Sequence, residues 1–405
     1  MATIKASDII RAAGICRRVS KSAAQPATHI LAGDGSREIT FTSWGLSDQV
    51  SMAVLPEGGE VAEGLDVATD AGLLESAAKG FAKDELVSVT VDDKGKLVLA
   101  SSESNSIYRL LTLPTDNLPE FAAPEARHEM SFGNGALLAG LIAVDYAKPA
   151  KDHRRILLGT NVSYQSKGRG ADTVYLTATD GKKLARVAVE VDEALTDKGA
   201  IAIGFDTDSP LGATIPDSAM AMIRKLDSEI ELIYGSLTLG AGGGAVTADG
   251  VCYIFRTLDG KYPDVNAVIP KDTPNQVKAN NKALIQLIRR AMVVTDEKSR
   301  SVVLSLDAAN ACIRARAANS STGNYAGEIE AEHECAGKGA EEVAFGCQYL
   351  IETLESLPGE VVSMRYATAN APWLFGEAGD VRTTLLMPIK LSEARAGDDP
   401  GSVED

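Results

Sequence analysis

The chain has 405 residues, which is too long for one ordinary hydrophobic core, so two or three domains are expected. Apolar residues make up 45% of it and charged residues 24%, the balance of a soluble globular protein. The formal net charge of −16 argues against a protein that binds nucleic acid over its whole surface, although it leaves a local basic surface open.

No segment predicts a membrane span or a secretory signal. The longest apolar stretch, Gly135–Val144, is far short of the roughly 20 residues that a bilayer requires. The N-terminus carries charge at Lys5, Asp8 and Arg11 and lacks an apolar signal core. The cysteines are scattered and odd in number, so we expect a cytoplasmic protein with reduced, mostly buried thiols. They are Cys16, Cys252, Cys312, Cys335 and Cys347.

Segments with the apolar spacing of a helix recur along the chain. In chain order they are Ser7–Val19, Ala68–Lys79, Gly135–Tyr146, Asp217–Leu226, Asn281–Val293 and Gly346–Leu354. The first, third and fifth form one series, and the others form a second series at similar intervals. The two series agree on three modules with two helices each.

The segments between the helices are short, rich in Val, Ile, Leu, Tyr and Thr, and bounded by turn residues, so they predict strands. The clearest are Leu86–Val91, Lys96–Leu99, Thr173–Ala178, Gly250–Phe255, Ser301–Leu306 and Val361–Tyr366. Each module is therefore expected to be an α+β unit, with two helices on one face of antiparallel sheet.

Proline-containing connectors, Arg109–Phe121 and Phe255–Pro270, end the first two modules and set the boundaries. The predicted organisation is an N-terminal module (1–126), a central module (127–270), a C-terminal module (271–391) and an acidic tail (392–405). The tail is charged and has no periodicity, so we expect it to be disordered.

Signals for chemistry are weak. Glu330–Cys335 has the composition of a metal cluster, but its residues alternate as in a strand, which puts Glu332 and Glu334 on one face and His333 and Cys335 on the other. Gly240–Gly244 precedes a predicted strand and fits a hairpin tip better than a dinucleotide fingerprint. No catalytic residue, metal or cofactor is therefore expected, and a metal-dependent enzyme centred on Glu330–Cys335 is the minor alternative.

Three local motifs, in this order, resemble the bacterial DNA polymerase III beta subunit, or sliding-clamp, family. TATDGKKLA (Thr177–Ala185) is similar to the family's T-D-G-H-R-L-A segment, and LDGKYPDVNAVIP (Leu258–Pro270) to its D-G-x-F-P-D-Y-x-x-V-[IL]-P connector. LLMPIKL (Leu385–Leu391) resembles the family's V-M-P-[MI]-[RK]-L ending. The resemblance covers about Met1 to Leu391 and includes the number of modules.

The resemblance implies three repeated DNA-clamp modules and a head-to-tail homodimeric ring that encircles duplex DNA without reading its sequence. It implies a non-catalytic processivity factor, with partners that include the polymerase III catalytic subunit, the clamp loader and repair proteins. The first module of one subunit should contact the last module of the other, through edge strands. A phage-encoded or accessory clamp paralogue is the main alternative.

Basic residues on or beside the predicted helices are candidates for facing DNA, because phosphate contacts are independent of sequence and suit a sliding protein. They are Arg11, Arg17, Arg18, Lys21, Lys148, Lys151, Arg224, Lys225, Lys282, Arg289 and Arg290. The first helix of the central module offers almost no positive charge, so its share is expected from the residues just after it.

The resemblance also implies a peptide-binding pocket between the central and C-terminal modules. Carried over by matching motifs, its residues are Leu157, Thr179, Gly181, Lys183, Leu184, Pro263, Val268, Leu385, Met387 and Pro388. The chain departs from the family's pattern at Lys182-Lys183, Val265 and Ala267, where His-Arg, Tyr and a basic residue are usual. These departures put the peptide preference in doubt.

Overall fold

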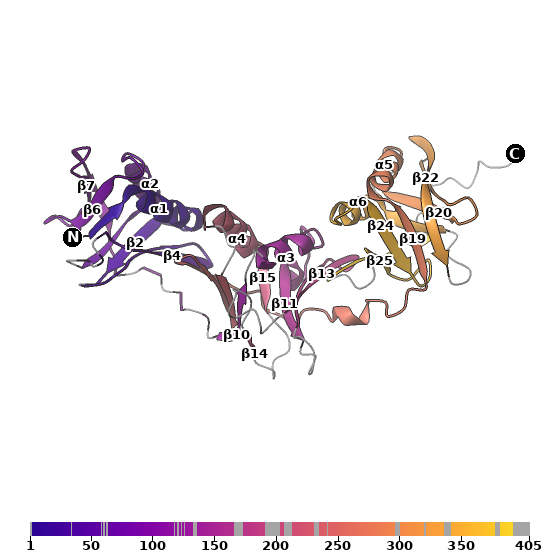
Figure 1. The fold of residues 1–405 in the computed structure, drawn as a ribbon, viewed down its shortest axis with the longest axis horizontal. Coiled ribbons are helices and arrows are strands. Elements are labelled where there is room, and N and C mark those ends of the chain that lie inside the picture. Colours follow the sequence, from indigo (N-terminus) through magenta and orange to yellow (C-terminus); the bar gives the residue numbers. More distant parts are fainter. Residues whose placement is uncertain are drawn as a thin grey trace. The chain divides into compact units, whose positions relative to one another are not determined.

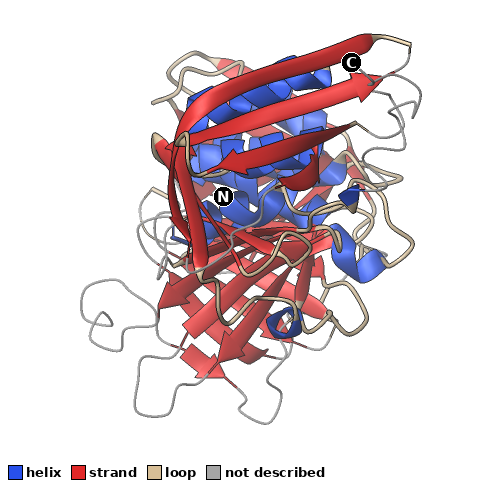
Figure 2. Cartoon of the chain, turned by 90° about the vertical axis from the view of Figure 1, so that its right-hand side faces the viewer, coloured by secondary structure: helices blue, strands red, loops and turns tan. Residues whose placement is uncertain are grey.

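The computed structural model describes residues 2–33, 35–57, 59, 61, 64–116, 118–119, 121–122, 124, 126–132, 136–165, 173–190, 203–205, 213–230, 235–240, 242–295, 300–319, 321–335, 342–376 and 381–391. The acidic tail predicted for residues 392–405 lies outside the described residues. Strands, drawn red in Figure 2, make up most of the regular structure, and the helices are few.

The N-terminal module begins with a strand and a helix, continues with strands, and repeats that order around a second helix (Figure 1). Its elements are β1 (Ala2–Lys5), α1 (Ala6–Ser20), β2 (Ala27–Ala32), β3 (Ile39–Trp44), β4 (Asp48–Val54), β5 (Leu65–Asp70), α2 (Ala71–Ala78), β6 (Leu86–Val91), β7 (Leu97–Ser101), β8 (Ser106–Leu110) and β9 (Thr112–Leu113).

The central module follows the same order of elements, with one additional strand between its two α-helices. It contains β10 (Ala126–Phe132), α3 (Ala136–Asp145), η1 (Arg155–Leu158), β11 (Gly159–Gln165), β12 (Thr173–Thr179), β13 (Lys183–Glu190), β14 (Ile203–Phe205), β15 (Thr214–Pro216), α4 (Asp217–Ile230), β16 (Gly235–Gly240), β17 (Gly243–Ala248), β18 (Val251–Arg256) and η3 (Val265–Ala267).

The C-terminal module repeats the order once more. It contains β19 (Asn275–Asn280), α5 (Asn281–Met292), β20 (Ser301–Asp307), β21 (Cys312–Asn319), β22 (Gly323–Cys335), β23 (Glu342–Gly346), α6 (Cys347–Glu355), β24 (Val361–Tyr366), β25 (Trp373–Phe375) and β26 (Arg382–Leu386).

The predicted helices are confirmed, and β6 and β24 match their predicted ranges residue for residue. Two helices differ most from their predicted bounds. Helix α4 continues to Ile230, and α2 begins at Ala71 because the preceding residues, Leu65–Asp70, form β5. The glycine-rich segment after Leu239 joins β16 to β17, with Gly240 paired opposite Gly243, so the predicted hairpin is confirmed.

Side-chain caps fix where two of the helices begin. The Asp70 carboxylate accepts a hydrogen bond from the Leu73 backbone N–H at 2.7 Å, at the start of α2. The Asn280 side chain accepts one from the Ala283 N–H at 2.9 Å, at the start of α5. Each cap satisfies a backbone donor that the first turn of a helix leaves without a partner.

The described residues form two compact units. The first comprises Met1–Ala139, Tyr164–Asp172 and Glu190–Asp259, and the second comprises Gly140–Ser163, Thr173–Val189 and Gly260–Asp405. The predicted central module contributes strands to both units, because β10 and β16–β18 belong to the first and β12 and β13 to the second.

In the first unit, α1 and α2 pack against two antiparallel sheets. One has the strand order β1-β6-β7-β8, and the other the order β14-β10-β16-β17-β18-β4-β3-β2-β5-β9. The second sheet is continuous because β4 of the N-terminal module pairs with β18 of the central module, from Asp48 opposite Phe255 to Met52 opposite Val251.

The second unit repeats this pairing one module further along. Its sheet has the neighbouring strands β11-β12-β13-β26-β25-β24-β19-β22-β21-β20-β23. Strand β13 of the central module pairs with β26 of the C-terminal module, from Lys183 opposite Leu386 to Val187 opposite Arg382. No helix in the described ranges is both long enough and apolar enough to cross a membrane.

An aromatic cluster holds the C-terminal module together. Trp373 is fully buried, stacks on Tyr366 with ring centroids 4.0 Å apart, and meets Phe345 edge-on at 5.5 Å. Around it lie the apolar stripe of α5, including Leu284 and Ile288, and residues from the strands. Because stacked and edge-on contacts add to the free energy gained by apolar burial, this cluster is a main source of stability for the module.

The substitution Trp373→Ala is expected to lower the free energy of unfolding by about 3–5 kcal/mol, because it leaves a large cavity beneath Tyr366 and Phe345. Urea denaturation followed by circular dichroism measures this loss. Trp373→Phe, which keeps an aromatic ring in the cluster, is the matched control and should cost clearly less. Equal losses for the two variants would contradict the importance of the packed ring.

Candidate nucleic-acid interface and peptide pocket

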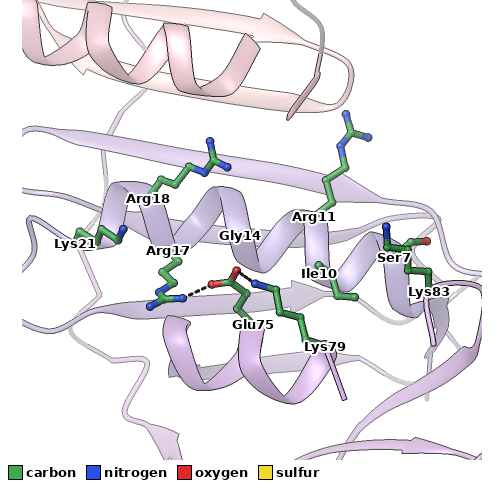
Figure 3. A pocket seen from close by; sticks show the side chains of 10 residues that line it. All are labelled: Ser7, Ile10, Arg11, Gly14, Arg17, Arg18, Lys21, Glu75, Lys79 and Lys83. Atoms are coloured by element: carbon green, nitrogen blue, oxygen red, sulfur yellow. Dashed lines mark hydrogen bonds and ion pairs between the residues drawn. The ribbon is translucent and has the colours of Figure 1, made fainter. Parts of the chain in front are cut away.

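Helix α1 presents a basic face to a groove beside α2 (Figure 3). Ile9, Ala12, Ala13, Cys16 and Val19 face the core, so the residues between them point outward at helical spacing. The groove has a volume of about 620 Å³. It is lined by Ser7, Ile10, Arg11, Gly14, Arg17, Arg18, Lys21, Glu75, Lys79 and Lys83.

The four predicted basic residues of the N-terminal module are therefore brought together, but most of them already have partners. Arg11 forms an ion pair with Asp249, and Arg17 Nη1 lies 2.6 Å from Glu75 Oε2. Arg18 Nη1 donates a hydrogen bond to the backbone oxygen of Lys225 at 2.9 Å. This last contact joins α1 to α4, the helix that carries the predicted Arg224 and Lys225.

Two cations of this groove, Lys79 and Lys83, were missed in the sequence. Lys79 follows α2 directly and lies four residues after Glu75, with its Nζ 2.5 Å from Glu75 Oε1. That i, i+4 spacing on a predicted helix was the available signal. Nothing local in the sequence places Lys83 beside α1, because their proximity depends on how α2 and the following loop fold back.

The C-terminal module offers a second basic helix face. Leu284, Ile288 and Ala291 of α5 are buried, whereas Lys282 and Arg290 are exposed and have no ion-pair partner among the described residues. Arg289 is also exposed, and its Nη2 lies 2.5 Å from Glu355 Oε1 on α6.

After α3, the two predicted cations differ in their surroundings. The Lys148 side chain is only 8% exposed and forms an ion pair with Asp145, one helical turn earlier. The Lys151 side chain remains exposed. Of the two, only Lys151 therefore presents its charge to solvent.

The apolar centre of the predicted peptide pocket lies within the second unit. Leu184, Leu374 and Leu385 form a buried cluster, against which Val265, Ile269 and Met387 pack while remaining partly exposed. The β13–β26 pairing creates it, because Leu184 lies directly opposite Leu385. A cluster with partly exposed Met and aliphatic side chains at its edge is an adaptable surface for an apolar side chain of a ligand.

The remaining predicted pocket residues lie in the same unit. Gly181 has a φ of +90°, in the turn where its N–H donates to Thr179 Oγ1 at 3.1 Å, and Leu157 is fully buried. Pro263 is exposed, as is Val268, 48% of which is accessible. The Met387 N–H donates to the Lys182 carbonyl at 2.8 Å, which fixes the segment that carries Pro388.

Lys183 lies apart from the apolar cluster, because alternate residues of β13 point to opposite faces and Leu184 faces the cluster. The Lys183 side chain is 6% exposed and forms an ion pair with Glu352 of α6. Its Nζ lies 5.6 Å from the ring centroid of Tyr146 and 5.1 Å from that of Tyr349. The side chain therefore joins β13 to α6.

Arg186, which was also missed in the sequence, lies beside the pocket. Its guanidinium stacks on Tyr175, 3.4 Å from the ring centroid, and its Nη1 donates to Asn266 Oδ1 at 2.7 Å. Burial lowers the pKa of this guanidinium, and the nearby Tyr175 and Asp264 oppose that shift. Among the described residues its Nε has no hydrogen-bond partner.

The segment with metal-like composition, Glu330–Cys335, ends β22 as predicted. Glu332 and Glu334 are exposed, and a ring nitrogen of His333 lies 3.1 Å from the Cys312 carbonyl oxygen. In the described part of the chain, no three His, Cys, Asp or Glu side chains are grouped so that they could hold a metal ion.

Comparisons with known proteins agree with this architecture. Residues 266–390 match the family model described as "DNA polymerase III beta subunit, C-terminal domain". The beta sliding clamp of Synechococcus elongatus is 26% identical over 365 residues, which cover 89% of this chain and 91% of the relative. That of Rickettsia bellii is 24% identical over 371 residues, again 89% of this chain and 91% of the relative.

Solved structures are similar over nearly the whole chain. The crystal structure of the DNA polymerase III subunit beta from Pseudomonas aeruginosa covers 96% of this chain, and 99% of its own chain is matched. The TM-score is 0.77 at 20% identity. The DNA polymerase sliding clamp from Caulobacter crescentus has a TM-score of 0.78 at 19% identity, with 96% and 99% of the two chains covered.

The repeated helix-and-sheet modules, continuous across their boundaries, define a clamp-type α+β protein. More particularly, residues 266–390 match the C-terminal domain of the DNA polymerase III beta subunit, and the relatives that the chain resembles over 89% of its length are beta sliding clamps.

The substitution Glu352→Ala should lower the free energy of unfolding, because it leaves the buried Lys183 ammonium without its counter-ion. Breaking a fully buried pair costs about 3–5 kcal/mol, and we expect about 2 kcal/mol here because the Glu352 side chain is 32% exposed. Chemical denaturation measures the change. The double variant Lys183→Met/Glu352→Ala should recover most of the loss, and a double variant less stable than Glu352→Ala alone would contradict this explanation.

Proposed function

We propose that this protein is a DNA sliding clamp, a non-catalytic subunit that encircles duplex DNA and tethers the replicative polymerase. The observation that carries the proposal is the repeated junction between modules. The fourth strand of one module pairs with the last strand of the next, first as β4 with β18 and then as β13 with β26. The similarity to beta sliding clamps over 89% of the chain supports the same function.

The junction pattern also supports a homodimer. Among the described residues, two equivalent strands are left without such a partner: β8, the eighth strand of the N-terminal module, which precedes the two-residue strand β9, and β22, the fourth strand of the C-terminal module. Strand β8 ends its sheet, and Gly323–Glu330 of β22 pair only with β21. If β22 of one copy pairs with β8 of a second, and the reverse, the two chains close head to tail, and no equivalent edge stays open.

Within such a ring the basic faces of α1 and α5 would meet the DNA backbone. Contacts from Lys and Arg to phosphates do not depend on base sequence, so they let the protein move along the duplex. Processivity then comes from topology, and the remaining partners dock from outside. Those partners are the polymerase III catalytic subunit, the clamp loader and other proteins with clamp-binding peptides, all in the cytoplasm.

The peptide pocket is the site at which these partners would dock. An extended peptide can place one or two apolar side chains against the Leu184–Leu385 cluster, where Met387 and Val265 adapt to their shape. A phage-encoded or accessory clamp would use the same pocket, and gene deletion in a host without a second clamp distinguishes it from a housekeeping clamp by loss of viability.

The dimer is tested with Ile107→Asp on β8, because Ile107 is 54% exposed at the strand that would pair with the partner. A charge buried in that contact should convert the dimer to a monomer. Light scattering should give twice the 42.5 kDa chain mass for the wild type and for the control Leu55→Asp, whose site is 70% exposed just beyond β4. A variant that stays dimeric would place the contact elsewhere.

The pocket is tested with a labelled Gln-Leu-x-Leu-Phe-type peptide and fluorescence anisotropy. Met387→Ala and Leu184→Ala should each weaken binding about tenfold, because each removes apolar contact area worth ~1–2 kcal/mol. The control Val381→Ala alters a residue that is 62% exposed and precedes β26. Unchanged affinity in Met387→Ala, with wild-type circular dichroism, would show that the peptide binds at another site.

A further inference from the structure

Several arginines of the basic helix faces are held by carboxylates of the same chain. This pairing links the first helix of a module to its second helix in both the N-terminal and the C-terminal modules. The two pairs are Arg17 with Glu75 and Arg289 with Glu355. A phosphate that binds either arginine must therefore compete with a carboxylate that is already in place.

Glu75 holds two cations at once (Figure 3). Its Oε2 lies 2.6 Å from Arg17 Nη1 and its Oε1 lies 2.5 Å from Lys79 Nζ. The Glu75 side chain is only 12% exposed, whereas Arg17 and Lys79 are 47% and 55% exposed. The carboxylate thus sits beneath two cations whose outer sides remain open to the groove.

The charge state of Glu75 suits this arrangement. Burial alone would raise the pKa of its carboxyl, but the hydrogen bonds from Arg17 and Lys79 outweigh burial and hold the pKa below its ordinary value. The group is therefore a carboxylate at neutral pH and becomes protonated only well into the acid range. Two charge-assisted hydrogen bonds to one carboxylate are among the stronger polar contacts available at a protein surface.

The C-terminal module has a simpler version of the same device. Arg289 Nη2 lies 2.5 Å from Glu355 Oε1, and both side chains are about half exposed, at 51% and 45%. In the same helix, Lys282 and Arg290 have no ion-pair partner among the described residues. Paired and unpaired cations therefore lie side by side on one helix face.

We propose that Glu75, and Glu355 in the C-terminal module, act as internal competitors of DNA phosphate. They limit how many phosphates the basic helices hold at one time, so contact with the duplex stays weak enough for movement along it. This inference rests on the proposed clamp function and adds a regulatory element to its DNA-facing surface. Glu75 is a positioning residue, because it acts through Arg17 and Lys79.

The test measures binding of a short labelled duplex by fluorescence anisotropy over a series of salt concentrations. The slope of log K against log salt is negative, and each additional phosphate contact makes it steeper by about 0.9. Glu75→Gln, which keeps the side-chain shape, should steepen the slope by about 0.9 to 1.8 as one or both freed cations reach phosphate. Affinity at low salt should rise at least severalfold, and Glu355→Gln should act in the same direction.

The matched control is Asp307→Asn, which removes one negative charge and one arginine contact, with Arg314 at 2.9 Å, on the β20–β21 hairpin. It reports the general effect of a less negative net charge and should leave the slope unchanged. Adding Arg17→Gln to Glu75→Gln should return part of the slope toward that of the wild type. If the Glu75–Arg17 pair had only a structural role, Glu75→Gln would change the stability of the protein but not the salt dependence of DNA binding.

The outcomes distinguish failure of the competitor role from failure of the clamp function. Salt-dependent binding by the wild type with an unchanged slope in both glutamine variants overturns the competitor role and leaves the clamp function standing. Wild-type protein that binds no duplex at any salt concentration overturns the proposed function itself. If Glu75→Gln does not fold, Glu355→Gln decides the inference alone, because its pair is more exposed and contributes less to stability.

Discussion

The architecture depends on how open strand edges are satisfied. A strand at the edge of a sheet exposes backbone N–H and C=O groups that pair readily with another chain. Here the fourth strand of one module covers the last strand of the next, so β4 with β18 and β13 with β26 make sheets that run through the predicted module boundaries. This explains why the compact units do not coincide with the modules: the pairing divides the central module's strands between them. The pairing also brings Leu184 opposite Leu385, so the apolar pocket is a product of the same junction.

The basic residues are concentrated on particular helices of an acidic chain. The chain carries a formal net charge of −16, yet α1 and α5 display arginines and lysines on their outer faces. An acidic protein with basic helices attracts a polyanion only where those helices face it, which suits the proposed contact with DNA. In the proposed clamp, the carboxylates of Glu75 and Glu355 would reduce this attraction at the helices themselves, because they pair with Arg17, Lys79 and Arg289. Strength of binding and freedom to slide are opposing requirements, and pairing some cations internally is a physical compromise between them.

Local patterns in the sequence were enough to predict the helices and many strands. The stripe formed by Leu284, Ile285 and Ile288 has the period of a helix, and the alternation in β6 and β24 has the period of a strand. Contacts between distant segments were not predictable in this way. Nothing near Lys83 indicates that it lines the α1 groove, because that proximity depends on the fold. The ion pair between Lys148 and Asp145, by contrast, has a local i, i+3 spacing, and only the burial of the Lys148 side chain required the structure. Lys183 was assigned to the pocket by its motif, but the pleat of β13 directs its side chain toward α6, which only the register of the sheet determines.

The structure compensates for one departure from the family's pattern at the pocket. Ala267 stands where a basic residue is usual, and it lies in the short helix η3, Val265–Ala267. In this chain a positive charge reaches that helix from another element, because Arg186 of β13 donates a hydrogen bond to Asn266 while stacked on Tyr175. The cation is thus supplied by the strand that also carries Leu184. A guanidinium held between an aromatic ring and an amide moves less than a basic side chain that is freely exposed on the connector. The pocket therefore retains a charge beside its apolar centre, although its sequence motif has lost one.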